Sequence, residues 1–457
     1  MRTTPFNHLD DAFLNIERQE DPWSVHLEVQ VSGRIDESRL RDALRATLQT
    51  HPMARARLQP YHEATVTYQW EIADAGDHLA LDVVTATTEA EIAAARERLI
   101  SIKVPITVAP AFYATLVHHA DGDWLMLSVN HTLADGLSTF RLLTSILRQY
   151  AGQPDPVPDF DPLTVRDLKA LAGSKSVPER IERIKHLMSY LRDAAMTPPG
   201  RVSGLAGARQ DLVNSPRGYG TVQMALTPDE TRRVMALREK PATINDLLLA
   251  AMALTIQRWN RQQGDVGGRV SLMMPVNLRP QAWWFEVVSN FSSYTTVQLP
   301  DDGISDLPTA MRNITAQTIQ LKEAGAAGTL IDLLDVPRWL PAILKARLRD
   351  ILPLVRKSLV ETTWLSNLGR LAEAPNMGDA GVVKALFFSP PAPMPMGVSL
   401  GVASMGDSLF MTLRYRKSLF TPAMADAFAQ LLRAELGLPL ERLTGLADAP
   451  GSASLGS

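Results

Sequence analysis

The stretch that decides the fold runs from residue 124 to residue 150 and reads WLMLSVNHTLADGLSTFRLLTSILRQY. Residues 124–130 have the apolar, strand-forming character of a buried β-strand. Residues 137–150 have helical periodicity, with one apolar face formed by Phe140, Leu143, Ile146 and Leu147. His131 therefore falls where a strand ends and just before a helix begins. Binding and catalytic side chains are common at such junctions, because a rigid scaffold holds the loop.

Residues 112–118 form a second strand-like run before this stretch, and Asp121-Gly122 between the two runs is a turn signal. The pair predicts a β-hairpin that leads into the His131 loop. We interpret His118 and His119, which precede the turn, as solvated. A metal site there is disfavoured because no second cluster of His, Asp and Glu supplies further ligands.

Further from this stretch, strands and helices continue on both sides, and the class expected is α/β with mixed sheets. The predicted units are an N-terminal half (1–175), a crossover or linker (176–215), a C-terminal half (216–450) and a disordered tail (451–457). Proline-rich sequence at residues 153–162 favours the break before the linker.

Composition excludes several functions. The chain has 457 residues, a formal net charge of -3 and no cysteine. Disulfides, thiolate metal sites and a cysteine nucleophile are therefore excluded, and nothing in the charge favours nucleic acid. No Gly-rich phosphate loop is present. A cytoplasmic location is expected, because no signal peptide is apparent and the uncharged stretch 385–406 is interrupted by four prolines.

The run Asn130-His-Thr-Leu-Ala-Asp-Gly136 suits acyl transfer from a thioester. The acceptor must lose a proton as it attacks, and a neutral histidine such as His131 can accept that proton near pH 7. Asp135 can brace the loop through an ion pair with an arginine, and Gly136 permits close backbone approach. The plainer alternative is a surface histidine followed by a capping aspartate.

The same run resembles the His-His-x-x-x-Asp-Gly motif of the CoA-dependent acyltransferase superfamily. That superfamily includes chloramphenicol acetyltransferase, nonribosomal peptide condensation domains and the wax ester synthase/diacylglycerol acyltransferase family. Other segments resemble family signatures in the same order along the chain, and they cover most of it. They are Leu9-Asp-Asp-Ala-Phe-Leu14, His51-Pro-Met-Ala-Arg-Ala-Arg-Leu58, Thr243-Ile-Asn-Asp-Leu-Leu-Leu-Ala250, Pro275-Val-Asn-Leu-Arg279, Ser289-Asn290 and Ser366-Asn-Leu-Gly369. The wax ester synthase and stand-alone condensation branches are the nearest.

This resemblance implies two chloramphenicol acetyltransferase-like halves that form a pseudo-dimer around a central tunnel. It implies that His131 is the general base, that Asp135 is structural with Arg279 as its candidate partner, and that Gly136 shapes the loop. Ser366 and Asn367 are expected to lie across the interface and to help bind the intermediate. No metal or bound cofactor is implied, since the acyl-CoA or carrier thioester is a co-substrate.

Two departures from the family pattern stand out. The first histidine of the motif is replaced by Asn130, for which we expect a substrate-binding position. The plant signature Asp-Phe-Gly-Trp-Gly is absent, which argues against the plant alcohol acyltransferase branch.

The first functional hypothesis is an acyltransferase that makes an ester or amide by direct attack of an alcohol or amine on an acyl-CoA or carrier-protein thioester. The alternative is a catalytically silent module that recruits a carrier protein or another partner, which Asn130 keeps open. A third possibility is another reaction on the same scaffold, such as cyclisation or hydrolysis. Lipid and natural-product acceptors are equally open.

Two segments and the assembly state have open interpretations. The basic residues within 335–357 form a solvated helix face or an anionic contact, with carrier phosphates, CoA or a membrane surface. Trp283-Trp284-Phe285 lines an acyl tunnel or anchors a loop by aromatic burial. We expect a monomer that binds no nucleic acid.

Overall fold

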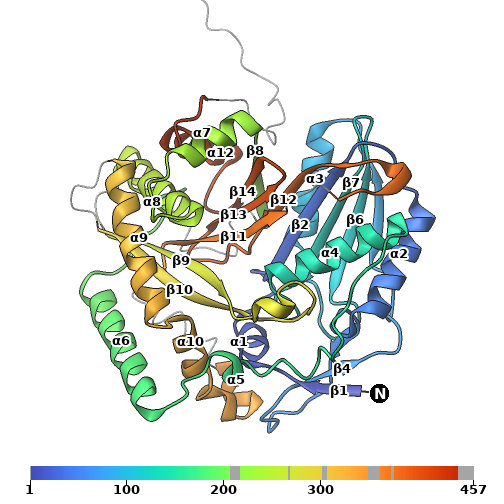
Figure 1. Cartoon of the computed structure of the whole chain (residues 1–457), viewed down its shortest axis with the longest axis horizontal. Helices are drawn as coiled ribbons and strands as arrows, with labels where there is room; N and C mark the ends of the chain where they lie inside the picture. Colours follow the sequence, from blue (N-terminus) through green and yellow to red (C-terminus); the bar gives the residue numbers. More distant parts are fainter. Residues whose placement is uncertain are drawn as a thin grey trace, which may run out of the picture.

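The structure is a computed structural model that describes residues 2–205, 217–265, 268–300, 306–347, 361–371 and 375–440. The predicted disordered tail, 451–457, and residues 348–357 of the predicted basic stretch lie outside the described residues. Two large sheets and one small sheet form the framework, and helices cover them (Figure 1).

The first large sheet has the strand order β12-β2-β7-β6-β5. Its strands are β2 (Ser24–Val31), β5 (Leu81–Thr85), β6 (Phe112–His118), β7 (Trp124–Asn130) and β12 (Val383–Ser389). The predicted hairpin is present as the antiparallel pair β6 and β7. Helix α4 (Gly136–Ala151) packs on β2 and β7 beside α2 (Glu37–Thr50), and α3 (Glu89–Ser101) packs on β6 and β7. Apolar side chains from these elements form one core.

The second large sheet has the order β10-β9-β11-β13-β14-β8. Its strands are β8 (Tyr219–Leu226), β9 (Val270–Asn277), β10 (Ser292–Leu299), β11 (Thr363–Leu371), β13 (Val398–Met405) and β14 (Ser408–Arg416). Helix α8 (Ile244–Gln262) is buried along most of its length, between the sheet and the helices α9 (Leu307–Glu323) and α12 (Pro422–Glu435). Helix α7 (Pro228–Ala236) packs on β8 and β14. This assembly forms a second core.

Both large sheets contain parallel and antiparallel neighbours. Strand β5 is parallel to β6, and β11 is parallel to β9 and β13, whereas the other pairs are antiparallel. The α/β class with mixed sheets, predicted from the sequence, is confirmed.

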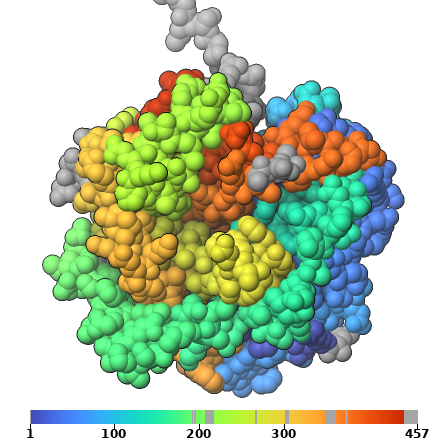
Figure 2. Space-filling view, viewed as in Figure 1, coloured from blue at the N-terminus to red at the C-terminus, as the bar shows by residue number. Residues whose placement is uncertain are grey.

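Strand β12 crosses from one half of the molecule to the other. It comes late in the chain, yet it pairs antiparallel with β2, so that Phe387 lies opposite Glu28. The chain then returns through prolines 390–395 to β13 in the second sheet. Figure 2 shows the orange segment lying against the blue and teal surface of the N-terminal part. A strand predicted in the C-terminal half thus completes the N-terminal sheet, because β2 offers an open hydrogen-bonding edge there.

The N-terminal segment and the region after α4 form the base below the two sheets. A small sheet joins β1 (Arg2–Pro5), β4 (Gln69–Ile72) and β3 (Ala56–Leu58). Helix α1 (His8–Ile16) lies beneath the junction of the large sheets (Figure 1), and Asn7 caps it through the amides of Leu9 and Asp10. Within the predicted linker, α6 (Val177–Met196) is a long helix whose Arg183 forms a 2.9 Å ion pair with Asp332 of α10 (Ala327–Leu334).

The remaining helical segments are short. They are α5 (Leu168–Ala172), η1 (Pro52–Arg55), η2 (Gln281–Trp283), η3 (Pro337–Trp339) and η4 (Gly378–Ala380). Across the described ranges, none of the helices combines the length and apolar character needed to cross a membrane.

Candidate active site

The backbone of the His131 loop is held from both large sheets. The His131 amide donates to the carbonyl of Trp23, which precedes β2, at 2.8 Å. The side-chain amide of Asn290, just before β10, donates to the carbonyls of His131 and Thr132 at 2.7 and 2.8 Å. The loop therefore has a fixed position at the junction of the two halves.

The His131 ring is almost fully buried. Its centroid lies 4.4 Å from that of Phe13 in α1, and its Nε2 is 3.4 Å from the hydroxyl of Tyr294. Burial lowers the pKa of His131, and the main-chain carbonyl of His131 itself and the charge of Asp135 oppose this only in part. Nδ1 is buried and makes no hydrogen bond of normal geometry. The imidazole is thus neutral at pH 7, which a general base requires.

His131 lines a pocket between the two sheets, with a cavity volume of about 70 Å³. Ser366 and Asn367 of β11 line the same pocket, as do Asp135 and Gly136. A Cβ on Gly136 would lie 2.8 Å from the end of the Leu368 side chain, so the glycine leaves room at this wall. The structure therefore brings together five of the residues singled out in the sequence.

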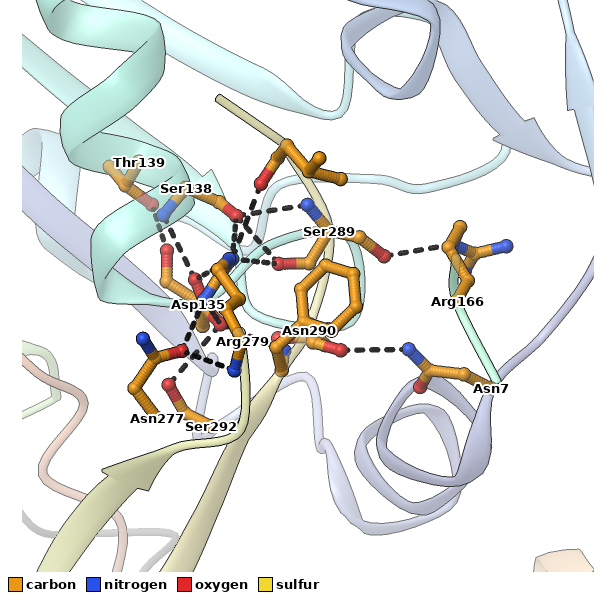
Figure 3. Close-up of polar contacts among 12 residues, drawn as sticks. Asn7, Asp135, Ser138, Thr139, Arg166, Asn277, Arg279, Ser289, Asn290 and Ser292 are labelled. Atoms are coloured by element: carbon orange, nitrogen blue, oxygen red, sulfur yellow. Dashed lines mark hydrogen bonds and ion pairs between the residues drawn. The ribbon is translucent and has the colours of Figure 1, made fainter. Parts of the chain in front are cut away.

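Asp135 is bound to Arg279 by two parallel contacts of 2.8 and 2.9 Å (Figure 3). Both side chains are wholly buried. The carboxylate also accepts the amides of Ser138, as the N-cap of α4, and Phe291, at 2.9 and 2.8 Å. Burial alone would raise the pKa of Asp135, but Arg279 and these hydrogen bonds lower it overall. The carboxylate is thus held ionised and joins α4 to the second sheet.

Comparison with known proteins was made on the sequence and on the fold. The sequence profile of the family described as Condensation domain matches residues 12–273. An uncharacterized protein of Mycobacterium tuberculosis is 38% identical over 412 residues, which cover 89% of this chain and 93% of that protein. The chain belongs to the condensation-domain family. The predicted resemblance to the CoA-dependent acyltransferase superfamily is thereby confirmed for the condensation-domain branch.

Two solved structures show the same fold at low identity. The first condensation domain of the CDA synthetase superposes with a TM-score of 0.68 at 13% identity, covering 95% of each chain. The trichothecene 15-O-acetyltransferase of Fusarium sporotrichioides superposes with a TM-score of 0.68 at 12% identity, covering 94% of this chain and 93% of that one. Membership of the condensation-domain family supports acyl transfer or condensation as the general class of chemistry.

Asn130 occupies the first position of the family's histidine pair but does not line the pocket. Its Nδ2 donates to the carbonyl of Val104 at 2.8 Å and approaches the Glu17 carboxylate at 3.3 Å. Its Oδ1 accepts the Thr132 amide at 2.8 Å. The position expected to bind substrate therefore faces the interior and holds the His131 loop, because all its polar atoms are used by the protein.

Sequence reasoning missed Asn290 and its surroundings. Ser289-Asn290 was named only as a segment that resembles a family signature and was given no role, yet both residues are fully buried. Arg166 binds the Ser289 hydroxyl at 2.8 Å and forms an ion pair with Asp10 of α1 (Figure 3 shows the Arg166–Ser289 contact). A polar Ser-Asn pair directly before a strand was the available signal. It does not reveal the partners, which come from three distant segments.

The prediction for His118 is wrong. Its side chain is buried, and its Nδ1 lies 2.7 Å from the Asp123 carboxylate, which also accepts the amides of Ile35 and His119. The carboxylate satisfies the imidazole where the hairpin meets α2, so this histidine is structural. In the part of the chain that the structure describes, no group of three or more His, Asp or Glu residues is arranged to hold a metal ion.

The aromatic segment near residue 284 packs into the loop at one residue and borders a pocket at another. Trp283 packs against Phe291, with ring centroids 5.3 Å apart, and anchors the loop. Phe285 instead lines a second pocket, with a cavity volume of about 290 Å³, together with Phe140 of α4. Leu368 lines both this pocket and that of His131.

Proposed function

We propose that this condensation-family protein is an acyltransferase that moves an acyl group from a CoA or carrier-protein thioester to an alcohol or amine. The observation that carries the proposal is the neutral His131, whose Nε2 faces a pocket walled by both sheets. A base in this position can take a proton from an acceptor held within the pocket.

The reaction needs His131 alone to move protons. Nε2 takes the proton of the acceptor hydroxyl or amine as that atom bonds to the thioester carbonyl carbon. When the intermediate collapses, the carbon–sulfur bond breaks and the thiolate receives the proton from Nε2. An ester or amide and a free thiol are formed. Direct displacement is favoured because the chain contains no cysteine to carry an acyl group.

The second pocket supports a long or bulky acyl substrate. It adjoins the His131 pocket at Leu368, and Phe140, Phe285 and Leu386 give it an apolar lining. We propose that the two pockets together form the central tunnel expected for the superfamily. Burying a hydrocarbon chain there would contribute a favourable binding free energy of about 25 cal/mol per Å² of apolar surface removed from water.

The silent-module alternative depended on Asn130. Because that side chain holds the loop and does not reach the pocket, its replacement of histidine does not remove a reacting group. A neutral His131 and the contacts that hold its loop are both present, which favours an enzyme over a recruiting module. We further propose that the protein acts as a monomer, since one chain supplies both walls of the pocket.

The test is thiol release from a panel of acyl-CoA donors of increasing chain length, each with short alcohols and amines. We expect release with at least one pair, and a rate lower by roughly 10²–10⁴ in His131→Ala. The control is His186→Ala, on the exposed face of α6, which should keep the full rate. Thiol release without an ester or amide product would identify water as the acceptor. A His131→Ala variant with the wild-type rate would refute the assignment.

A further inference from the structure

Tyr294 is the polar side chain closest to the reacting atom of His131 among the hydrogen bonds of the described residues. Its hydroxyl is 3.4 Å from Nε2. Its ring stacks on Trp364 of β11, with centroids 6.0 Å apart at 26°, and meets Phe13 edge-on at 6.3 Å. The aromatic neighbours on two sides fix where the hydroxyl lies, inside the His131 pocket.

This phenol can donate a hydrogen bond but cannot act as a base. Burial raises the pKa of Tyr294, and the charge of Asp135 raises it further. The hydroxyl therefore keeps its proton throughout the pH range in which proteins function. Since neutral His131 accepts on Nε2, the phenol is the donor of this pair in the empty pocket.

An acceptor alcohol or amine needs the same lone pair of Nε2. When it binds there, the phenol loses its hydrogen-bond partner, and a donor left unsatisfied beside the bound substrate is costly. The nearest new charge is the oxygen of the attacked carbonyl, since the carbonyl carbon must lie next to the acceptor atom. The Ser292 hydroxyl, which shares the pocket, already donates to Asp135.

We propose that Tyr294 is a catalytic residue that donates to His131 Nε2 in the free enzyme and to the thioester carbonyl oxygen during acyl transfer. This rests on the proposed acyltransferase function. As the acceptor bonds to the carbonyl carbon, its proton passes to Nε2 and the carbonyl electron pair moves to the oxygen. That oxyanion accepts the Tyr294 hydrogen bond without taking the proton. Collapse expels the thiolate, which is protonated by Nε2, and the phenol returns to the histidine.

The experiment compares wild type with Tyr294→Phe, which keeps the ring stacked on Trp364 and removes only the hydroxyl. We expect kcat to fall by roughly 10²–10³, the usual effect of losing one oxyanion donor. KM should change by less than about threefold, since the bond to the carbonyl strengthens only in the transition state. The matched control is Tyr415→Phe, a buried phenol in the second core, which should keep the wild-type kcat.

The pH profile of kcat/KM separates a catalytic role of Tyr294 from a purely structural one. Removing the phenol donor removes stabilisation of the neutral imidazole, so the acid limb of kcat/KM should move to higher pH in Tyr294→Phe. The charged or titratable groups that face His131 are then Asp135 and, through it, Arg279, and neither is changed.

The outcomes distinguish failure of the proposed function from failure of the role assigned to Tyr294. A wild type that transfers no acyl group overturns the proposed function, and the role of Tyr294 with it. An active wild type whose Tyr294→Phe variant keeps kcat within threefold overturns the role of Tyr294 alone. A fall in kcat with an unmoved acid limb also overturns it, because a purely supporting side chain would give that result.

Discussion

Replacing Asp135 by Asn tests whether the Asp135–Arg279 pair holds the two halves together. The variant keeps the size of the side chain but leaves the Arg279 guanidinium buried without its counter-ion. The carboxylate accepts hydrogen bonds from Arg279, Ser138, Phe291 and Ser292, and an amide turns two donors toward some of these groups. Breaking one partner of a buried pair costs about 3–5 kcal/mol of unfolding free energy. Measured by urea unfolding with a slope of about 3 kcal/mol per M, the midpoint should fall by roughly 1–1.7 M.

Urea unfolding should be measured at pH 7, where the Asp135 carboxylate is ionised. Because the pKa of Asp135 is lowered below its ordinary value of 3.8, the contribution of the pair is fully present above that value and is lost as pH falls through the lowered pKa. Wild type should therefore lose this part of its stability only in strong acid, and Asp135→Asn should lack it at every pH.

Two further variants make the test decisive. Asp42→Asn breaks an exposed pair with Arg45, whose side chains are 71% and 61% exposed, and should cost less than about 1 kcal/mol. Arg279→Met, alone and combined with Asp135→Asn, completes a double-mutant cycle. A coupling energy near zero, or a loss in Asp135→Asn no larger than in Asp42→Asn, would show that the pair does not join the halves.

Two predictions concern the His131 loop directly. Asn290→Ala removes the donor to the carbonyls of His131 and Thr132, so kcat should fall by roughly tenfold or more. Circular dichroism should show that the secondary structure is retained. An unchanged kcat would show that the loop is held by other contacts. In wild type, the half-maximal point of the acid limb of kcat/KM should lie below pH 6.5, because burial lowers the pKa of His131 from that value. A half-maximal point above pH 6.5 would contradict the burial of the neutral base.

Much of the local structure could be predicted from the sequence, because local patterns determine it. The strand at 124–130, the loop at His131 and the following helix lie where the hydrophobic periodicity placed them. Asp36 and Thr243 cap the helices that follow them, as short polar side chains at such positions favour. These features depend on neighbours within a few residues, and the sequence displays those neighbours directly.

The contacts across the junction could not be predicted in the same way. Arg279 was found only through the resemblance to a family, and Asn290 and Tyr294 were missed, because their partners lie more than 150 residues away in the chain. His118 was misjudged for a related reason: a histidine before a turn is exposed unless a carboxylate such as Asp123 is positioned to receive it. Tertiary pairing leaves no periodic signal in a single sequence.

Because β12 crosses into the first sheet, the two halves cannot be obtained as separate domains by cutting the chain once. A cut after Arg201 would give an early fragment whose sheet ends at β2 with an unpaired edge, and a late fragment carrying a strand with no sheet to join. Neither piece is a complete domain, because β12 belongs to the first sheet while the chain on either side of it belongs to the second. The segment between Ser389 and Val398 therefore ties the two sheets together at a second place in the chain, in addition to the connection that leads into β8.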